Sequence, residues 1–188
     1  MQQSLSQMLF DISFGNEDAF RRLVHQFSDK TYQFACSIIK NAEDAEEIIS
    51  DVFLNIWLHR ENLPAGEQFI FYLYKAIKNT SLNYLKKKNR QKESAAEPGY
   101  FLEAVGSHYL NPEEVAISRE NVLRIEQVIN ALPGRCRQIF VLVKEDGLSY
   151  REVAELLDIS PATVNVQMTI ALKKIWQELV PDHHRFLS

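Results

Sequence analysis

The stretch from Glu67 to Lys92 combines aromatic side chains with basic ones. Its first half places four aromatic residues within six positions: Phe69, Phe71, Tyr72 and Tyr74. Its second half ends in five basic residues: Lys86, Lys87, Lys88, Arg90 and Lys92. Aromatic faces stack on unpaired bases and lysines hold phosphates, so the combination is typical of contacts with single-stranded nucleic acid. The alternative is a structural helix whose aromatics are core and whose lysines favour the negative end of the helix dipole.

A helix must present these groups, because no Gly or Pro interrupts the stretch and apolar residues recur near a 3.6-residue period. We expect this helix to run to about Lys88, with Ile70, Leu73, Ile77 and Tyr84 facing inward. The side chains predicted to remain outside are Tyr72, Lys75, Lys78, Asn79, Asn83 and Lys86.

Carboxylates gather on a second helix, predicted from Asn41 to Arg60, the most regular amphipathic segment of the chain. The face opposite its apolar stripe holds Glu43, Asp44, Glu46, Glu47, Ser50, Asp51 and Asn55. Leu54 protrudes beside these acids. With no histidine on this face, the pattern does not favour a metal or acid–base site. It indicates either a solvated face or a docking surface for a basic partner.

Two capped segments near the C-terminus predict a helix-turn-helix. Ser149 and Glu152 form a capping box, and Ser160–Pro161 begins a second helix after a short turn at Asp158. The helix Pro161–Lys174 would enter the major groove. Its inward residues are expected to be Val164, Met168, Ala171, Leu172 and Ile175. Its outward residues are expected to be Ala162, Thr163, Asn165, Val166, Gln167 and Thr169.

Asn165 and Gln167 can read bases, adenine in particular. The first basic residue of this helix is Lys173, however, and phosphate contacts supply most of the affinity for DNA. A helical hairpin of purely structural purpose is therefore the alternative.

The composition of the 188 residues supports an all-α protein of two small helical domains. Gly and Pro are scarce, at six each. The segment from about Gln7 to Lys40 carries one apolar stripe over 19–27 and a second over 34–39, which predicts two core helices, the first capped by Asn16. Periodicity is lost between about Asn89 and Asn111, which indicates a flexible linker over 93–111. It joins a first domain, 1–92, to a second domain, 112–188, which opens with Asn111 as N-cap and Pro112 at the first helical position.

The net charge of −4 is unevenly distributed, because residues 67–92 alone carry +6. This segregation fits a local nucleic-acid contact in an otherwise acidic protein. The two cysteines, Cys36 and Cys136, have no second Cys or His at metal-ligand spacing, which predicts free thiols in a reducing cytoplasm. No signal peptide and no run of 18 apolar residues occurs, so we expect neither export nor a membrane anchor.

Taken together, the chain resembles an extracytoplasmic-function (ECF) sigma factor of the sigma-70 family. The segments that carry the resemblance are EDAFRRLV, DAEEIISDVFLNIW, FIFYLYKAIKNTSLNYLKKK, NPEEV and ALPGRCRQIFVLVKEDGLSYREVAELLDISPATV. The resemblance implies a region 2-like domain that binds core RNA polymerase and opens the −10 element, and a region 4-like domain that reads the −35 element. Its implied partners are the β′ clamp helices and β flap of polymerase, promoter DNA and an anti-sigma factor, which can be membrane-bound.

The resemblance also assigns site residues. For polymerase binding they are Asp44, Glu47, Asp51 and Leu54. For the −10 element they are Leu63, Tyr72, Lys75, Lys78, Asn79, Asn83 and Lys86. Asn79 matches the asparagine that helps hold a flipped base, and Leu63 lies near a position where the family usually has an aromatic. For the −35 element they are Ser160, Ala162, Thr163, Asn165, Val166, Gln167, Thr169 and Lys173. Family members often carry arginine where this chain has Asn165.

Two other functions remain open at this point. A stand-alone helix-turn-helix regulator would bind duplex DNA without polymerase, but it leaves the stretch 67–92 unexplained. An enzyme is disfavoured because no nucleophile–base pair, phosphate loop or metal-ligand spacing occurs, and no cofactor or small-molecule substrate is expected.

Overall fold

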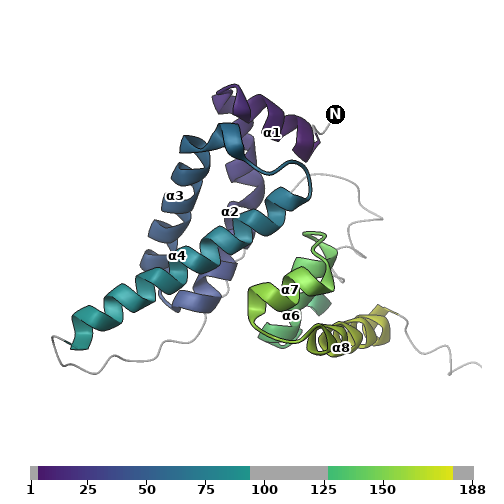
Figure 1. Cartoon of the computed structure of the whole chain (residues 1–188). Helices are drawn as coiled ribbons and strands as arrows, with labels where there is room; N and C mark the ends of the chain where they lie inside the picture. The colour runs from purple at the N-terminus through teal and green to yellow at the C-terminus, as the bar shows by residue number, and fades with distance from the viewer. Residues whose placement is uncertain (1–3, 94–126, 180–188) are drawn as a thin grey trace, which may run out of the picture. The chain divides into compact units, whose positions relative to one another are not determined.

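The computed structural model describes residues 4–93 and 127–179. Every regular element in these two ranges is helical, and the chain divides into two compact units, Met1–Gly106 and Ser107–Ser188. Figure 1 shows helices α1 to α4 in the first unit and α6 to α8 in the second. The all-α class with two helical domains is therefore confirmed. Helix α4 continues to Glu93, past the end predicted near Lys88 and into the first residue of the predicted linker 93–111. The rest of that linker and the predicted cap at Asn111–Pro112 lie outside the described residues.

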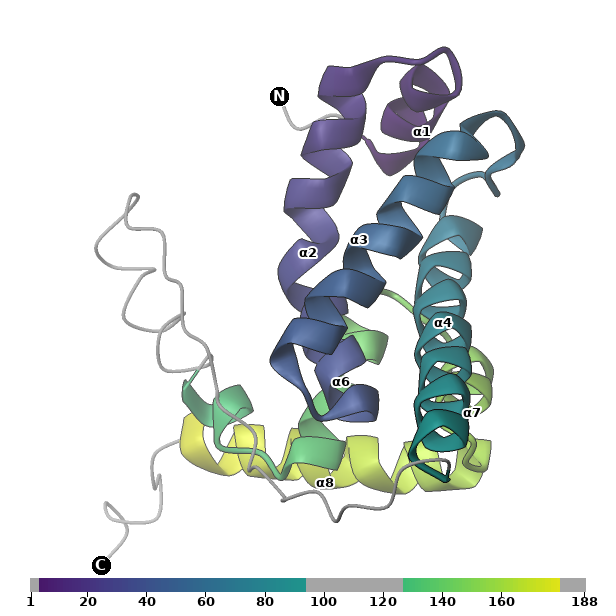
Figure 2. The ribbon, with the colours of Figure 1, turned by 90° about the vertical axis from the view of Figure 1, so that its left-hand side faces the viewer.

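The first unit is a bundle of three long helices with a short one at its end. Its elements are α1 Leu5–Ser13, α2 Glu17–Ile39, α3 Ala42–Leu58, the 3₁₀ turn η1 Arg60–Asn62 and α4 Gln68–Glu93. Helices α2, α3 and α4 pack on one another in pairs, and α1 contacts both α2 and η1 (Figure 2). The bundle therefore places α3 and α4, which carry the acidic and the basic faces, side by side.

Helix α2 corrects the prediction that the apolar stripes over 19–27 and 34–39 form two helices, because a single helix spans both. The predicted cap is present: the Asn16 side chain accepts a hydrogen bond from the Ala19 amide at 3.0 Å. The chain has no Gly or Pro to stop the helix between the stripes. At the polar interruption, the fully buried Thr31 hydroxyl donates to the Phe27 carbonyl at 2.7 Å, so the core loses no hydrogen bond there.

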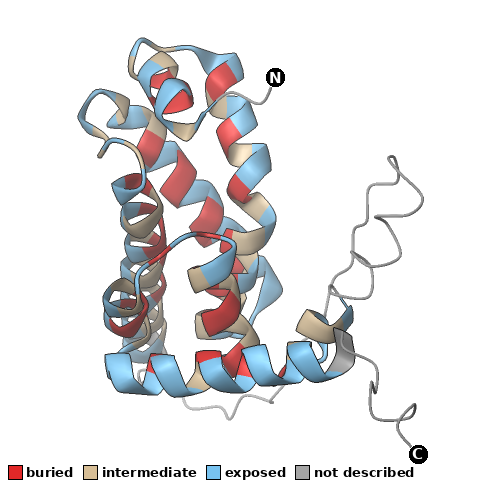
Figure 3. Ribbon diagram, turned by 90° about the vertical axis from the view of Figure 1, so that its right-hand side faces the viewer, coloured by how far each residue is buried: buried red, intermediate tan, exposed pale blue. Residues whose placement is uncertain are grey.

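Aromatic side chains join α4 to α2 in the core. The rings of Phe69 and Phe27 meet edge to face with centroids 6.4 Å apart, and those of Tyr74 and Phe34 with centroids 5.0 Å apart. All four are buried, and the buried residues line the inside of the bundle (Figure 3). Edge-to-face pairs of this kind contribute about 0.5–1.5 kcal/mol each beyond their buried area, so they fix the rotation of α4 about its axis.

The second unit contains the predicted helix-turn-helix. Residues 127–130 are helical and are followed by α6 Gly134–Lys144, α7 Tyr150–Leu157 and α8 Pro161–Leu179. The capping box at the start of α7 is present in both directions, and Asp158 ends that helix in the left-handed region at φ 52°. The Arg135 guanidinium on α6 donates to the Leu157 carbonyl at 2.8 Å, which ties α6 to the end of α7.

Both cysteines are free, as predicted, with Cys36 half-buried and Cys136 buried. Burial raises the pKa of each thiol, which keeps both protonated near neutral pH. Among the described residues, no helix is long and apolar enough to cross a membrane, and no group of three His, Cys, Asp or Glu side chains could hold a metal ion.

Candidate nucleic-acid and protein-binding surfaces

Helix α4 presents one polar face to solvent. Tyr72, Lys75, Asn79, Asn83 and Lys86 are exposed, and their spacing of three and four residues places them on a single stripe. The sixth predicted member, Lys78, is half-buried. With a rise of about 1.5 Å per residue, the stripe runs for about 21 Å along the helix. We call this stripe, from Tyr72 to Lys86, the α4 face.

The aromatic run at the start of α4 is mostly core. Phe69 and Tyr74 are buried, and Phe71 is half-buried with the Lys75 ammonium 5.3 Å from its ring centroid. Of the four aromatics, Tyr72 alone is exposed, at 37%. The structural interpretation of this run therefore holds for most of it, and Tyr72 is the member that can stack on a base.

Leu63 lies in extended conformation between η1 and α4 and is half-buried. The chain turns into α4 at Gly66, whose φ of +58° favours glycine. A Cβ on Gly66 would lie 3.5 Å from the Ser6 hydroxyl, so α1 approaches this segment closely. The segment that precedes the α4 face is thus supported from behind by α1.

The acidic side of α3 faces solvent as predicted, with one exception. Glu43, Glu46, Glu47 and Asp51 are exposed, and Leu54 is 56% exposed beside them. The opposite side of the helix is buried, with Val52, Phe53 and Ile56 in the core. We call the exposed set Glu47, Asp51 and Leu54 the α3 face.

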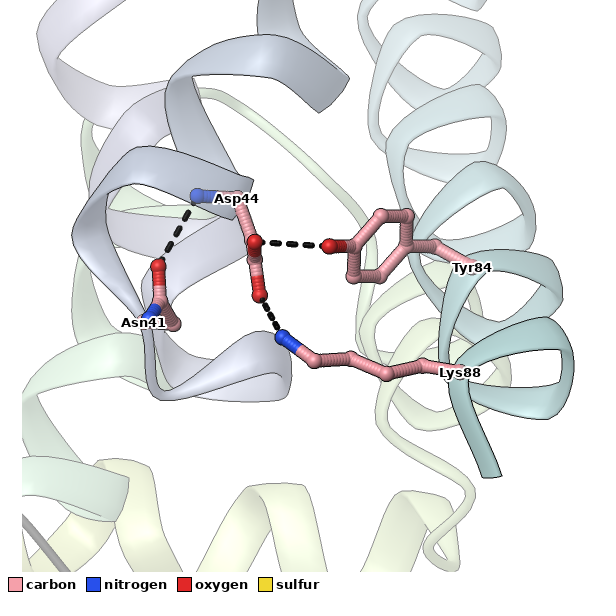
Figure 4. A network of polar contacts seen from close by, with 4 residues as sticks. All are labelled: Asn41, Asp44, Tyr84 and Lys88. Atoms are coloured by element: carbon pink, nitrogen blue, oxygen red, sulfur yellow. Dashed lines mark hydrogen bonds and ion pairs between the residues drawn. The ribbon is translucent and has the colours of Figure 1, made fainter. Parts of the chain in front are cut away.

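Asp44 is the exception, because its carboxylate turns toward α4 (Figure 4). One oxygen accepts a hydrogen bond from the Tyr84 hydroxyl at 2.6 Å, and the other forms an ion pair with the Lys88 ammonium at 2.5 Å. The backbone amide of Asp44 donates to the Asn41 side chain at 2.9 Å. The Asp44 side chain is only 17% exposed, so the prediction that it lies on the outward acidic face is wrong.

The pKa values of the three side chains are shifted by this network. Burial pushes the pKa of Asp44 upward, but the hydrogen bonds from Lys88 and Tyr84 and the Lys88 charge outweigh it, and the net pKa is lowered. The hydrogen bond to Asp44 raises the pKa of Lys88 and that of Tyr84. At neutral pH the network is therefore a carboxylate held by a neutral phenol and an ammonium.

The sequence analysis did not predict this network, because Tyr84 and Lys88 lie 40 and 44 positions after Asp44 in the chain. The helical periodicity of each segment shows only which side faces the core. The same periodicity predicted that Tyr84 faces inward, whereas Tyr84 is half-buried and its hydroxyl donates a hydrogen bond to Asp44.

Helix α8 exposes most of the residues predicted to face DNA. Ala162, Thr163, Asn165, Val166, Thr169 and Lys173 are exposed, together with the N-cap Ser160. Gln167 differs from the prediction: it is half-buried, and its backbone carbonyl accepts from the Cys136 thiol of α6 at 3.3 Å. Leu172, predicted to face inward, is 46% exposed. The predicted apolar stripe was too wide around the helix. The buried side, which packs on α6 and α7, holds Val164, Met168 and Ala171, and Leu172 lies outside it.

Each of the two helical units matches a known protein family. Residues 23–91 match the sigma-70 region 2 family and residues 123–175 match the sigma-70 region 4 family. The chain is an ECF sigma factor of the sigma-70 family. The region 2 match takes in most of α2, all of α3 and nearly all of α4, and the region 4 match takes in α6, α7 and most of α8.

Relatives of this sigma factor match along nearly the whole chain. The ECF RNA polymerase sigma factor SigW of Bacillus subtilis is 26% identical over 181 residues, covering 89% of this chain and 92% of SigW. The ECF RNA polymerase sigma-E factor of Escherichia coli is 25% identical over 190 residues, covering 96% and 97%. The sigma factor RpoE of Bartonella quintana, solved in complex with the anti-sigma factor NepR, has a TM-score of 0.51 at 18% identity, covering 85% of this chain and 96% of that one. This last likeness supports the fold.

Proposed function

We propose that this sigma factor directs promoter-specific transcription initiation through three surfaces: the α3 face for core polymerase, the α4 face for the −10 element and α8 for the −35 element. The observation that carries the proposal is the bundle of the first unit. It holds an acidic face on α3 next to a basic and amide-rich face on α4, with the aromatic core fixing both helices. One rigid body can then contact polymerase and DNA together.

The α3 face is proposed to bind the β′ clamp helices of polymerase. Glu47 and Asp51 lie one helical turn apart and give paired negative charge, and Leu54 adds an exposed apolar anchor. A partner helix with basic residues around an apolar patch would complement both the charges and the leucine. Charged residues at the rim of an interface set orientation, and a buried apolar residue supplies affinity. Asp44 is a positioning residue in this proposal, because it binds α4 and holds the first turn of α3 in place.

The α4 face is proposed to hold the unpaired non-template strand of the −10 element. Tyr72 offers a stacking surface, Asn79 and Asn83 offer amides, and Lys75 and Lys86 offer positive charge. Base stacking on an aromatic contributes about 1–3 kcal/mol per base, whereas separating ten base pairs costs about 14 kcal/mol of stacking. The sigma factor therefore captures a strand that polymerase helps to open, and it acts by binding rather than by catalysis.

Two further assignments belong to the same proposal. Helix α8 is proposed to read the −35 element, with the second unit docked on the β flap. An anti-sigma factor is proposed as a regulatory partner, supported by the complex in which the Bartonella quintana sigma factor was solved. All of these contacts would occur where polymerase works, in the cytoplasm.

The test is reconstitution with sigma-free core RNA polymerase. The purified protein is mixed with core, and complex formation and transcription from a promoter library are measured. We expect a stable complex and transcripts from promoters with common −35 and −10 sequences. Tight duplex binding without polymerase, and no complex with core, would instead favour the stand-alone helix-turn-helix regulator.

A further inference from the structure

The outward side of the recognition helix α8 is apolar at its centre. Ala162, Val166 and Ile170 follow one another at intervals of four residues, and all three are exposed, Val166 at 55%. They lie opposite the residues that α8 buries against α6 and α7, namely Val164, Met168 and Ala171. In a helix-turn-helix, the side opposite the buried one is the side that enters the major groove.

The polar side chains around this stripe are largely committed to the helix itself. The Thr163 amide donates to the Ser160 hydroxyl at 3.0 Å, and the two hydroxyls are 2.9 Å apart, so both serve the N-terminal cap. The Thr169 hydroxyl donates to the Asn165 carbonyl at 2.9 Å, which commits its proton to the helix backbone. The Asn165 amide remains exposed at the edge of the stripe.

The charge on α8 matches this arrangement. Its basic side chains are Lys173 and Lys174, in the second half of the helix, and no arginine occurs between Pro161 and Leu179. Recognition of guanine in the major groove commonly uses bidentate Arg or Lys contacts to O6 and N7. The first half of α8 has neither. It does have methyl groups, which complement the C5-methyl of thymine, and the exposed Asn165 amide, which can pair with adenine N6 and N7.

We infer that α8 specifies its −35 element by contacts with thymine methyl groups, made by Ala162, Val166 and Ile170, with Asn165 reading one adenine. The ligand is thus an A·T-rich stretch of major groove. This inference rests on the proposed −35 role of α8 and adds what that helix selects. Burying one methyl group against Val166 corresponds to about a fourfold gain in affinity.

The test replaces thymine by uracil, which removes only the C5-methyl group. Upstream elements are first selected from a randomised promoter library with the reconstituted holoenzyme, and their thymines are then replaced one at a time. We expect A·T-rich elements, with about a fourfold loss of holoenzyme binding for each contacted thymine and about 15-fold for two. Selection of guanine-rich elements, or binding unchanged by uracil at every position, would overturn the inference.

A substitution cycle assigns the contact to a side chain. In Val166→Ala, replacement of the matching thymine by uracil should no longer weaken binding, because the methyl has lost its partner. Leu172→Ala is the matched control, since Leu172 is an exposed apolar residue of the same helix outside the stripe, and it should keep full sensitivity to uracil. If Val166→Ala keeps that sensitivity at every thymine, Val166 does not make the contact.

The outcomes separate the inference from the proposed function. If transcription by the holoenzyme depends on the upstream element but is insensitive to uracil, the −35 role of α8 stands and the proposed methyl contacts are refuted. Holoenzyme whose transcription is independent of that element loses the −35 role of α8 itself.

Discussion

Replacing Asp44 by alanine should destabilise the first unit although Asp44 lies near the protein surface. The substitution removes the acceptor of the Tyr84 hydroxyl and the partner of the Lys88 ammonium. It also leaves α3 and α4 without their polar connection at this end of the bundle. The side chain of Asp44 is 17% exposed and that of Lys88 is 38% exposed, so solvent screens the two bonds to different degrees.

The expected loss is about 2 kcal/mol in the free energy of unfolding. A hydrogen bond to a charged group contributes about 1.5–3 kcal/mol, and the short bond from Tyr84 to the shielded carboxylate falls in that class. The ion pair with Lys88 adds about 0.5 kcal/mol or less after discounting for its exposure. Glu47→Ala on the same helix is the control, because Glu47 is exposed, and it should change stability by less than about 0.5 kcal/mol.

The two tryptophans allow the first unit to be followed in the full-length protein. Trp57 is in α3, half-buried against Phe20 with ring centroids 5.0 Å apart, whereas Trp176 is in α8 and 69% exposed. In a Trp176→Phe background, fluorescence during urea unfolding reports on the first unit alone. Equal midpoints and slopes for the Asp44→Ala and Glu47→Ala variants would refute the stabilising role of the network.

The network also predicts how stability depends on pH. The folded pKa of Asp44 is lowered, so its contribution is fully present above the pKa of an unfolded aspartate, about 3.9, and is lost as pH falls through the folded value. The folded pKa of Lys88 is raised, so its contribution is present below about 10.4 and lost as pH rises through the folded value. The stability difference between wild type and Asp44→Asn should therefore be constant near neutral pH and shrink below about pH 4.

Three further variants, one of them a double substitution, test the other assignments. Reversing both charges of the α3 face, Glu47→Lys with Asp51→Lys, should weaken core polymerase binding at least tenfold. The reason is that coupling energies of close charge pairs at an interface exceed about 1.5 kcal/mol. Gel filtration or fluorescence titration measures the binding. Asn79→Ala should lower open-complex formation, followed by permanganate reactivity of unpaired thymines, while core affinity stays unchanged. Lys40→Gly should stabilise the first unit by about 0.5–1 kcal/mol in urea, because Lys40 ends α2 at φ 57°, where glycine is unstrained.

Each of these has a matched control. Glu43→Lys reverses a single exposed charge one helical turn before Glu47, outside the residues proposed to bind polymerase, and should affect polymerase binding less than the double reversal does. Asn89→Ala, exposed on α4 beyond the α4 face, should leave promoter opening intact, and equal opening by Asn79→Ala and wild type would contradict the role of Asn79. Lys40→Ala keeps the strained backbone, so a gain equal to that of Lys40→Gly would show that strain is not the cause.

Local chemistry explains what the sequence could predict. The caps at Asn16 and Ser149 follow from bonds between neighbours three residues apart, and both are present. Periodicity likewise identified α3, α4 and the helix-turn-helix, because each has an apolar stripe long enough to specify one buried side.

Errors arose where a distant element decides the outcome. Asp44 looks outward on α3 alone, and only the arrival of Tyr84 and Lys88 from α4 turns it inward. Leu172 fits the spacing of a buried stripe, yet it is exposed, because α6 and α7 pack against the neighbouring side of α8 that holds Ala171. The division of α2 into two helices ignored that a buried threonine can satisfy its hydroxyl within its own helix.

The uninterrupted length of α4 has a consequence for how related chains can diverge. Phe69 and Tyr74 set the rotation of the helix, and every side chain downstream inherits that phase. Inserting or deleting one residue within α4 would turn everything beyond it by about 100° and move Asn79 and Asn83 off their stripe. Length changes should therefore accumulate between helices and be purged from α4, even though much of this helix is exposed.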